Sequence, residues 1–160
     1  MNRVNWLYQL AIFLSKKGEH IMYSALDVAK YVVCKCTNDN CPISNLHLQK
    51  ILYYLQRDYL RNGEALFSDE IQAWRFGPVV SEVYYNYCGY GSLPIEEIGD
   101  VEIEQCDKER VDPIIDAYKY KNPWDLVKET HKPGGAWAIV FNDGAGDHNI
   151  IPKTLIAEKG

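Results

Sequence analysis

The sequence has no apolar run long enough to cross a membrane, no internal repeat and no low-complexity tract. Its most apolar stretch, residues 6–14, is far shorter than the ~20 residues that span a bilayer. Residues 15–20 follow it without the small-residue cleavage site that ends a signal peptide. We therefore expect a protein that does not enter a membrane and that works in the cytoplasm.

The spacing typical of metal ligands is also missing. The chain has five cysteines, an odd number that favours reduced thiols over a disulfide framework. Cys34, Cys36 and Cys41 are close in sequence, but a structural zinc site needs a second pair of ligands, and none follows. The glycine-containing loop at residues 144–146 lacks the Lys-Ser/Thr of a phosphate loop. We predict neither a metal nor a cofactor.

Positive charge is in short supply, because 17 Lys and Arg residues against 22 Asp and Glu residues give a net charge of -5. A basic face is the usual footprint of nucleic-acid binding, so we expect no nucleic acid as a partner. An acidic chain suits a basic protein partner better, although charge mostly sets encounter rate and solubility. A helix-turn-helix that binds DNA is the alternative, and it requires a basic face to form in three dimensions.

Nothing in the chain is spaced like a catalytic centre. We find no acid/base pair and no activated nucleophile. His131, directly after Thr130, is a candidate general base, but no nucleophile or positioned water is evident beside it. We interpret His131 as a hydrogen-bonding residue at a helix end, where it favours the helix dipole. The prediction is a protein that is not an enzyme.

The chain does contain ample material for one folded domain, with 160 residues of which 47% are hydrophobic. Helical spacing dominates, so we predict a mainly α, compact single domain of about five to seven helices. Ser24 and Ser44 are expected to cap the first two helices. The second helix carries an apolar stripe at helical spacing, made of Leu48, Ile51, Leu52, Leu55 and Tyr59.

Prolines mark the expected starts of three later helices. Gly77-Pro78 is expected to begin the third helix, with Pro at its first position, where the missing N–H costs little. Pro113 is expected near the start of another helix, and Asn122-Pro123 opens the next. A short β element is expected near residues 65–75 or 100–104.

Residues 1–21 stand apart from this domain. The stretch Lys16-Lys17-Gly18-Glu19, just before Met22, can be encoded by a purine-rich bacterial ribosome-binding sequence. Our hypothesis is that residues 1–21 are a translated leader and that 22–160 form the domain. The competing interpretation is an amphipathic helix packed on the domain or on a partner, with the apolar residues Trp6, Leu7, Leu10, Ile12, Phe13 and Leu14.

Acids concentrate in residues 96–109, which hold seven Asp and Glu residues and one lysine, a local net charge of -6. We interpret this segment as a solvated acidic edge. Within it, Val101 to Glu104 alternate between apolar and acidic residues, so a short exposed strand is the alternative.

Twelve tyrosines and four tryptophans provide candidates for contact with a partner. Adjacent residues of a helix point about 100° apart, so Tyr53 and Tyr54 cannot both face inward. Lys50 is expected to be solvated or paired with an acid across the fold. Trp74 suits packing beside the bend at residues 77–78, and an interface anchor is its alternative. The candidate partner-binding residues are Gln49, Lys50, Tyr53, Tyr54, Trp74 and Tyr85.

Two linked strings resemble the Panacea antitoxin domain family, also described as SocA-like or phage-associated GepA-like proteins. The strings are Leu46-x-Leu48-Gln49-Lys50-Ile51-Leu52-Tyr53-Tyr54-x-Gln56 and Ala73-Trp74-x-x-Gly77-Pro78-Val79-Val80-x-x-Val83-Tyr84. Thr130-His131 and Gly135-x-Trp137 resemble later family positions, and the likeness extends over residues 23–156. We interpret Gly77, Pro78, Thr130, His131 and Trp137 as structural motif residues, with Gly77 allowing a close approach or a positive φ.

This resemblance implies a compact helical domain that occurs in prophages and mobile elements. It implies an antitoxin that binds and neutralises a cognate protein toxin. Our own hypothesis for the mechanism is occlusion, in which an aromatic face flanked by acids covers the toxin's active surface. The alternative that the resemblance implies is a proteolytic adaptor, which delivers the toxin or other cargo to an ATP-dependent protease. Residues 96–111 match no family motif, so the choice of partner is expected to reside there.

Overall fold

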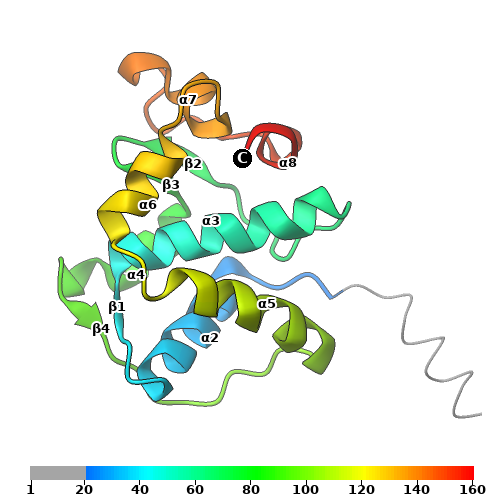
Figure 1. Ribbon diagram of the computed structural model, residues 1–160, viewed down its shortest axis with the longest axis vertical. Coiled ribbons are helices and arrows are strands. Elements are labelled where there is room, and N and C mark those ends of the chain that lie inside the picture. The colour runs from blue at the N-terminus through cyan, green and yellow to red at the C-terminus, as the bar shows by residue number, and fades with distance from the viewer. Residues whose placement is uncertain (1–20) are drawn as a thin grey trace, which may run out of the picture.

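The computed structural model describes residues 21–160, so the proposed leader at residues 1–21 lies almost wholly outside the described residues. One long helix, α3 (Asn45–Arg61), crosses the middle of the molecule (Figure 1). The helices α2 (Ala25–Asn38) and α5 (Gln105–Tyr118) lie on one side of α3, and the helices of the C-terminal third lie on the other (Figure 1). The fold is therefore organised around a central helix.

The described part is mainly helical, with seven α-helices and four short strands, which confirms the predicted fold class. The strands form two antiparallel pairs, β1 (Ile43–Ser44) with β4 (Pro94–Ile95) and β2 (Gln72–Trp74) with β3 (Gly77–Val79). The remaining helices and 3-10 turns are α4 (Ser81–Tyr87), η1 (Cys88–Tyr90), α6 (Pro123–Thr130), α7 (Ala136–Phe141), η2 (Asn142–Gly144) and α8 (Lys153–Lys159).

The predicted caps begin their helices. The Ser24 hydroxyl accepts a hydrogen bond from the Asp27 amide, and Ser44 does the same for His47 at the start of α3. At α6 the Asn122 side chain caps the helix and a proline fills its first turn. Each side chain satisfies a backbone N–H that has no partner inside the helix.

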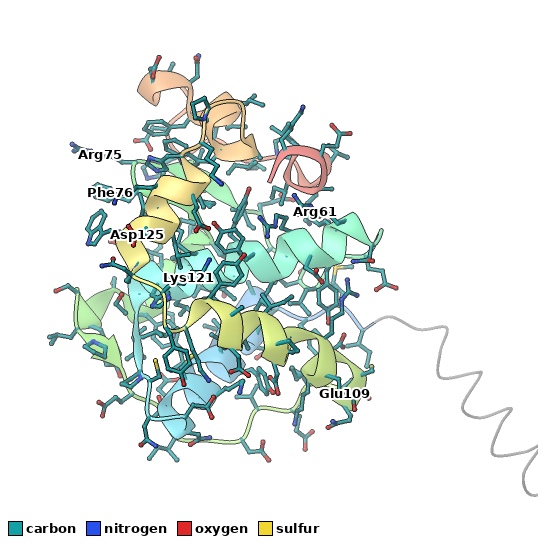
Figure 2. All side chains as sticks on the ribbon, viewed as in Figure 1. Arg61, Arg75, Phe76, Glu109, Lys121 and Asp125 are labelled. Carbon is teal, nitrogen blue, oxygen red and sulfur yellow. The ribbon has the colours of Figure 1, made fainter. Side chains whose placement is uncertain are left out.

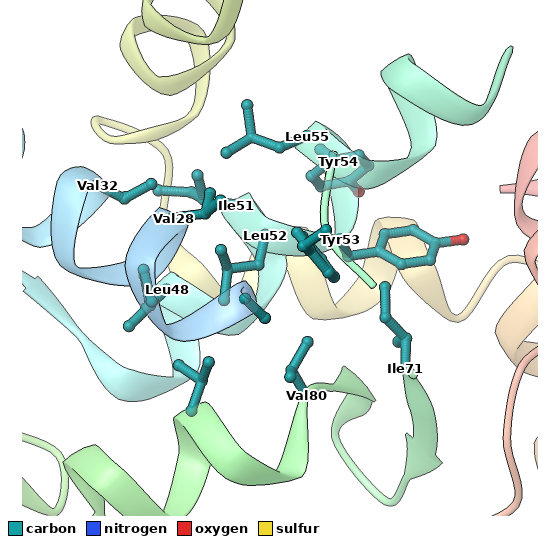
Figure 3. Packing of buried hydrophobic residues seen from close by; sticks show 14 of the residues in the cluster. Val28, Val32, Leu48, Ile51, Leu52, Tyr53, Tyr54, Leu55, Ile71 and Val80 are labelled. Carbon is teal, nitrogen blue, oxygen red and sulfur yellow. The ribbon is translucent and has the colours of Figure 1, made fainter. Parts of the chain in front are cut away.

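The apolar stripe of α3 is buried as predicted, but burial extends all the way round this helix. Twelve of its 17 residues are buried, among them both Tyr53 and Tyr54. Figure 3 shows Val28 and Val32 of α2 on one side of α3, and Val80 and Ile71 on another. Neighbours on every side leave no solvent-facing surface over most of the helix, so the expectation that one of the two tyrosines faces outward is wrong.

Residues 77–79 form a strand, so the expected helix start at Gly77-Pro78 is wrong. β2 and β3 make a hairpin in which Trp74 pairs with Gly77, leaving Arg75 and Phe76 as a two-residue turn. Helix α4 begins only at Ser81. The hairpin confirms a β element near residues 65–75, and Ile150 extends it by pairing with Gln72 of β2.

No strand forms at residues 100–104, and α5 begins earlier than its proline suggests. Ile103 is buried in the core instead of alternating along a sheet edge. In the first turn of α5, the Asp107 carboxylate accepts hydrogen bonds of 2.7 Å from the hydroxyls of Tyr23 and Tyr59. These bonds fix the start of α5, and Pro113 lies inside the helix.

Candidate functional site

Gln49 and Lys50 of α3 hold the β2–β3 hairpin by hydrogen bonds to its backbone. The Gln49 side-chain oxygen accepts from the amide of Val80 at 2.9 Å, and the Lys50 ammonium donates to the carbonyl of Pro78 at 3.1 Å. The other end of the Gln49 amide donates to Asn45. Both motif residues are buried, so they position the hairpin from inside the protein.

Lys50 was expected to be solvated or paired with an acid. It is instead enclosed by the protein, and its amine contacts the carbonyl of Pro78. Its side chain has no exposed surface, and no carboxylate in residues 21–160 forms an ion pair with it. Burial lowers the pKa of Lys50 to about 7, because the charged form is poorly solvated inside the protein. Lys50 is therefore close to the boundary between its charged and neutral forms at physiological pH.

Gly77 makes room for the Lys50 side chain. Its φ of +107° is a conformation that residues with a side chain rarely adopt. A Cβ at this position would lie 2.8 Å from the Lys50 nitrogen and 2.9 Å from the Thr130 hydroxyl. Residue 77 thus lies against both the buried Lys50 amine and the Thr130 hydroxyl, and only glycine fits at this position.

His131 lies at the end of α6 with its ring stacked on Trp137, the ring centres being 3.6 Å apart. Trp137 in turn donates a hydrogen bond of 2.8 Å to the carbonyl of Trp74 in the hairpin. The Nε2 atom of His131 is buried and finds no hydrogen-bond partner among residues 21–160. Burial and the nearby Lys50 charge lower the pKa of His131. A neutral stacked ring replaces the expected charged, hydrogen-bonding histidine.

The two buried tyrosines of α3 also have partners inside the protein. Tyr54 stacks on Tyr118 with 4.3 Å between ring centres and donates a hydrogen bond to Glu129. Tyr53 packs edge-on against Tyr54 and points away from α3 toward the C-terminal helices (Figure 3). A small polar pocket of about 100 Å³, whose lining includes Tyr53, Arg57 and Lys132, lies beside them.

Exposed rings lie at the tip of the hairpin and on α6, at positions that the sequence analysis did not single out. Phe76 is 49% exposed and Trp124 is 52% exposed, and their rings meet edge-to-face at 5.4 Å. The guanidinium of Arg75 lies 5.6 Å from the centre of the Phe76 ring. We call Arg75, Phe76 and Trp124 the tip patch, and Figure 2 shows Arg75 and Phe76 projecting from one side of the molecule.

A second group of rings gathers around Trp74, whose indole is half-buried. It is made of Trp74, Tyr84, Tyr85 and His148, and we call it the ring cluster. His148 lies 4.4 Å from the indole, and Tyr85 is 63% exposed. Of the six candidate partner-binding residues, Tyr85 is exposed and Trp74 is half-buried, while the four on α3 are buried.

The residues that the structure describes give little support for other kinds of site. No three His, Cys, Asp or Glu side chains within residues 21–160 converge as metal ligands would. Nor is any helix of this part both long and apolar enough to pass through a membrane.

Comparison with known proteins places this framework in a family. The model of the family described as Antitoxin SocA-like, Panacea domain, matches residues 48–138, which include α3, the hairpin and the His131–Trp137 stack. Antitoxin SocA of Caulobacter vibrioides (strain NA1000 / CB15N) is 27% identical over 129 residues, covering 72% of this chain and 69% of that protein. No solved structure matches. The chain belongs to the SocA-like antitoxin family that is defined by the Panacea domain.

Proposed function

We propose that this chain is an antitoxin that neutralises a cognate protein toxin by binding it, without catalysing a reaction. Family membership supports the antitoxin role, and the tip patch supports direct binding. Half-exposed aromatic side chains are enriched in protein interfaces and often dominate their binding energy. We further propose that the pair of proteins is encoded on a prophage or mobile element and acts in the cytoplasm.

The observation that carries this proposal is the contact between Phe76 and Trp124. Two large rings share an exposed surface although neither is needed to fill the core. The hairpin beneath them is fixed by Lys50 and Gln49, so little conformational freedom is lost when a partner docks. Such a rigid aromatic surface suits steric covering of a toxin.

The test is co-expression with the product of the neighbouring gene, each protein under its own inducible promoter. We expect the neighbour alone to stop colony formation, this protein to restore it, and the two to purify as a complex. A double Phe76→Ala and Trp124→Ala variant should fail to restore growth. Leu93→Ala, which removes an apolar side chain that is 67% exposed on another segment, is the matched control.

The half-life of the toxin separates covering from delivery to a protease. A toxin that is covered keeps its half-life or gains a longer one when this protein is present. A shortened half-life in a pulse-chase would instead favour the adaptor mechanism with an ATP-dependent protease. If no neighbouring gene product is toxic alone and rescued by this protein, the antitoxin proposal is lost.

A further inference from the structure

The acids of this protein are most concentrated in residues 96–109, which carry a net charge of -6. The other residues of the described part, residues 21–160, carry -1 together. The end of this acidic edge leads into α5, whose Glu109 lies across the molecule from Arg75 and Phe76 (Figure 2). The part of the acidic edge that enters α5 is therefore remote from the tip patch.

Arg75 is the cation in contact with the rings of the tip patch, because its guanidinium lies 5.6 Å from the centre of the Phe76 ring. The segment that supplies Trp124, residues 121–132, holds three lysines and two acids, and its Lys132 lines the pocket beside Tyr53 instead. Both acids already have partners, because Asp125 pairs with Lys128 at 3.0 Å and Glu129 pairs with Lys121 at 3.5 Å. Arg75 is exposed and has no ion-pair partner among residues 21–160. Its charge is available to an incoming carboxylate.

We infer that the tip patch docks an acidic segment of the toxin that carries a large apolar side chain. This inference rests on the proposed function and adds the chemistry of the partner. The apolar side chain packs against Phe76 and Trp124, and carboxylates beside it meet Arg75. Complementary charge of this kind speeds encounter and selects partners more than it adds affinity.

A protein segment fits this surface better than a nucleic acid does. Binding to a phosphate backbone relies on several cations that each neutralise a phosphate. Here two of the lysines on or beside α6 are already paired with acids of the same segment. One unpaired arginine beside two rings is instead the composition of a protein hot spot, where aromatic residues and Arg are enriched.

Photo-crosslinking tests which molecule reaches the tip patch. The photoreactive residue p-benzoylphenylalanine is placed at position 76 in the full chain, and the same residue at the exposed position 93 serves as the control. Cells that contain the neighbouring gene are irradiated, and the crosslinked peptide is identified by mass spectrometry. We expect a peptide from the neighbouring gene's product with a surplus of Asp and Glu, captured at position 76 and not at 93.

Charge reversal tests whether the captured segment is recognised through its acids. Binding of the captured protein, purified, is measured at low and at high salt for the wild type, Arg75→Glu and Glu158→Lys. Arg75→Glu should weaken binding about tenfold at low salt and much less at high salt, because salt screens exposed charges. Glu158→Lys reverses an exposed charge on α8 and should leave the affinity within about twofold.

The outcomes of these two experiments test the inference about the tip patch independently of the antitoxin proposal. Rescue of growth together with a basic crosslinked peptide, or with no effect of Arg75→Glu, overturns the inference and leaves the antitoxin role intact. A nucleic acid at position 76, or residues 96–109 of a second copy of this chain, also overturns it. If no neighbour is toxic, capture of another acidic protein whose binding depends on Arg75 still supports this surface chemistry.

Discussion

The Lys50 ammonium donates a hydrogen bond to the carbonyl of Pro78 from a position that solvent does not reach. The bond ties the centre of α3 to the second strand of the hairpin. Its donor is a base whose pKa burial lowers from 10.5 to about 7. Lys50 therefore couples the position of the hairpin to the protonation state of its own buried amine.

Stability should rise with pH between 7.0 and 8.0, and Lys50 should be a main cause. The folded-state pKa of about 7 lies below the unfolded value of 10.5, so unfolding takes up a proton in this range. The free energy of unfolding should increase by about 1 kcal/mol per pH unit. Chemical denaturation at several pH values measures this slope. Below pH 7 the penalty of burying the charge is fully present.

Lys50→Met should remove most of that slope. The histidines whose pKa burial lowers, His47 and His131, exert their effect below this range. Burial raises the pKa of Cys34 and of Cys36, so these thiols oppose the slope only as their unfolded forms ionise toward pH 9. All four groups therefore contribute little between pH 7.0 and 8.0, where the slope of Lys50 is measured. An unchanged slope in Lys50→Met would show that the amine is solvated in the folded protein.

Gly77→Ala should destabilise the protein by roughly 2–4 kcal/mol, because it adds backbone strain and crowds the Lys50 amine. Gly89→Ala is the control, since a Cβ there would meet nothing within 4 Å and its φ is not in the positive range. The control should change stability by less than about 0.5 kcal/mol. Thermal unfolding of the two variants compares them directly. Equal effects would argue against the close approach.

Asp107→Ala should cost about 2–4 kcal/mol, because it leaves the hydroxyls of Tyr23 and Tyr59 without their acceptor. Glu109→Ala, two residues later on the same helix, removes an exposed carboxylate and should have an effect below about 0.5 kcal/mol. Urea unfolding midpoints measure the difference. Similar values for the two variants would mean that Asp107 belongs to the solvated edge.

Tyr85→Ala tests whether the ring cluster shares in binding. The side chain is largely exposed, so stability should stay within about 0.5 kcal/mol. We predict that its affinity for the toxin falls about fivefold to tenfold, less than for a buried anchor. Isothermal titration calorimetry provides the measurement, with Tyr120→Ala, another exposed tyrosine, as the control. An unchanged affinity would confine binding to the tip patch.

Local signals in the sequence were enough to predict the starts of α2, α3 and α6. Serine caps, the asparagine before Pro123 and the apolar stripe of α3 act over one or two turns, so spacing alone reveals them. The start of α4 was missed because Gly77-Pro78 satisfies the rules for a helix start equally well. What decides in favour of a strand is Gln49 and Lys50, which bind the backbone of residues 78–80 from a distant helix.

The surface residues were harder to predict than the core. Phe76 lies between two motif residues at a position that the motif leaves open, and its exposure follows only from the two-residue turn. Trp124 comes next to it through the packing of α6 against the hairpin. The motif residues Gln49 and Lys50, by contrast, are polar and so suggested contact with a partner. They are polar because they satisfy buried backbone groups of the hairpin.

The enclosed position of α3 has a consequence for synthesis of the chain. Its neighbours include α2 before it and α8, the last described helix, after it. While the ribosome is still adding the second half of the chain, the tyrosine and leucine side chains of α3 have no complete cover. The hairpin is incomplete until residues 148–151, whose backbone bonds to residues 71–73, have been translated. If the chain neutralises a toxin as proposed, protection begins only some time after initiation, which favours an antitoxin made ahead of its toxin or in excess of it.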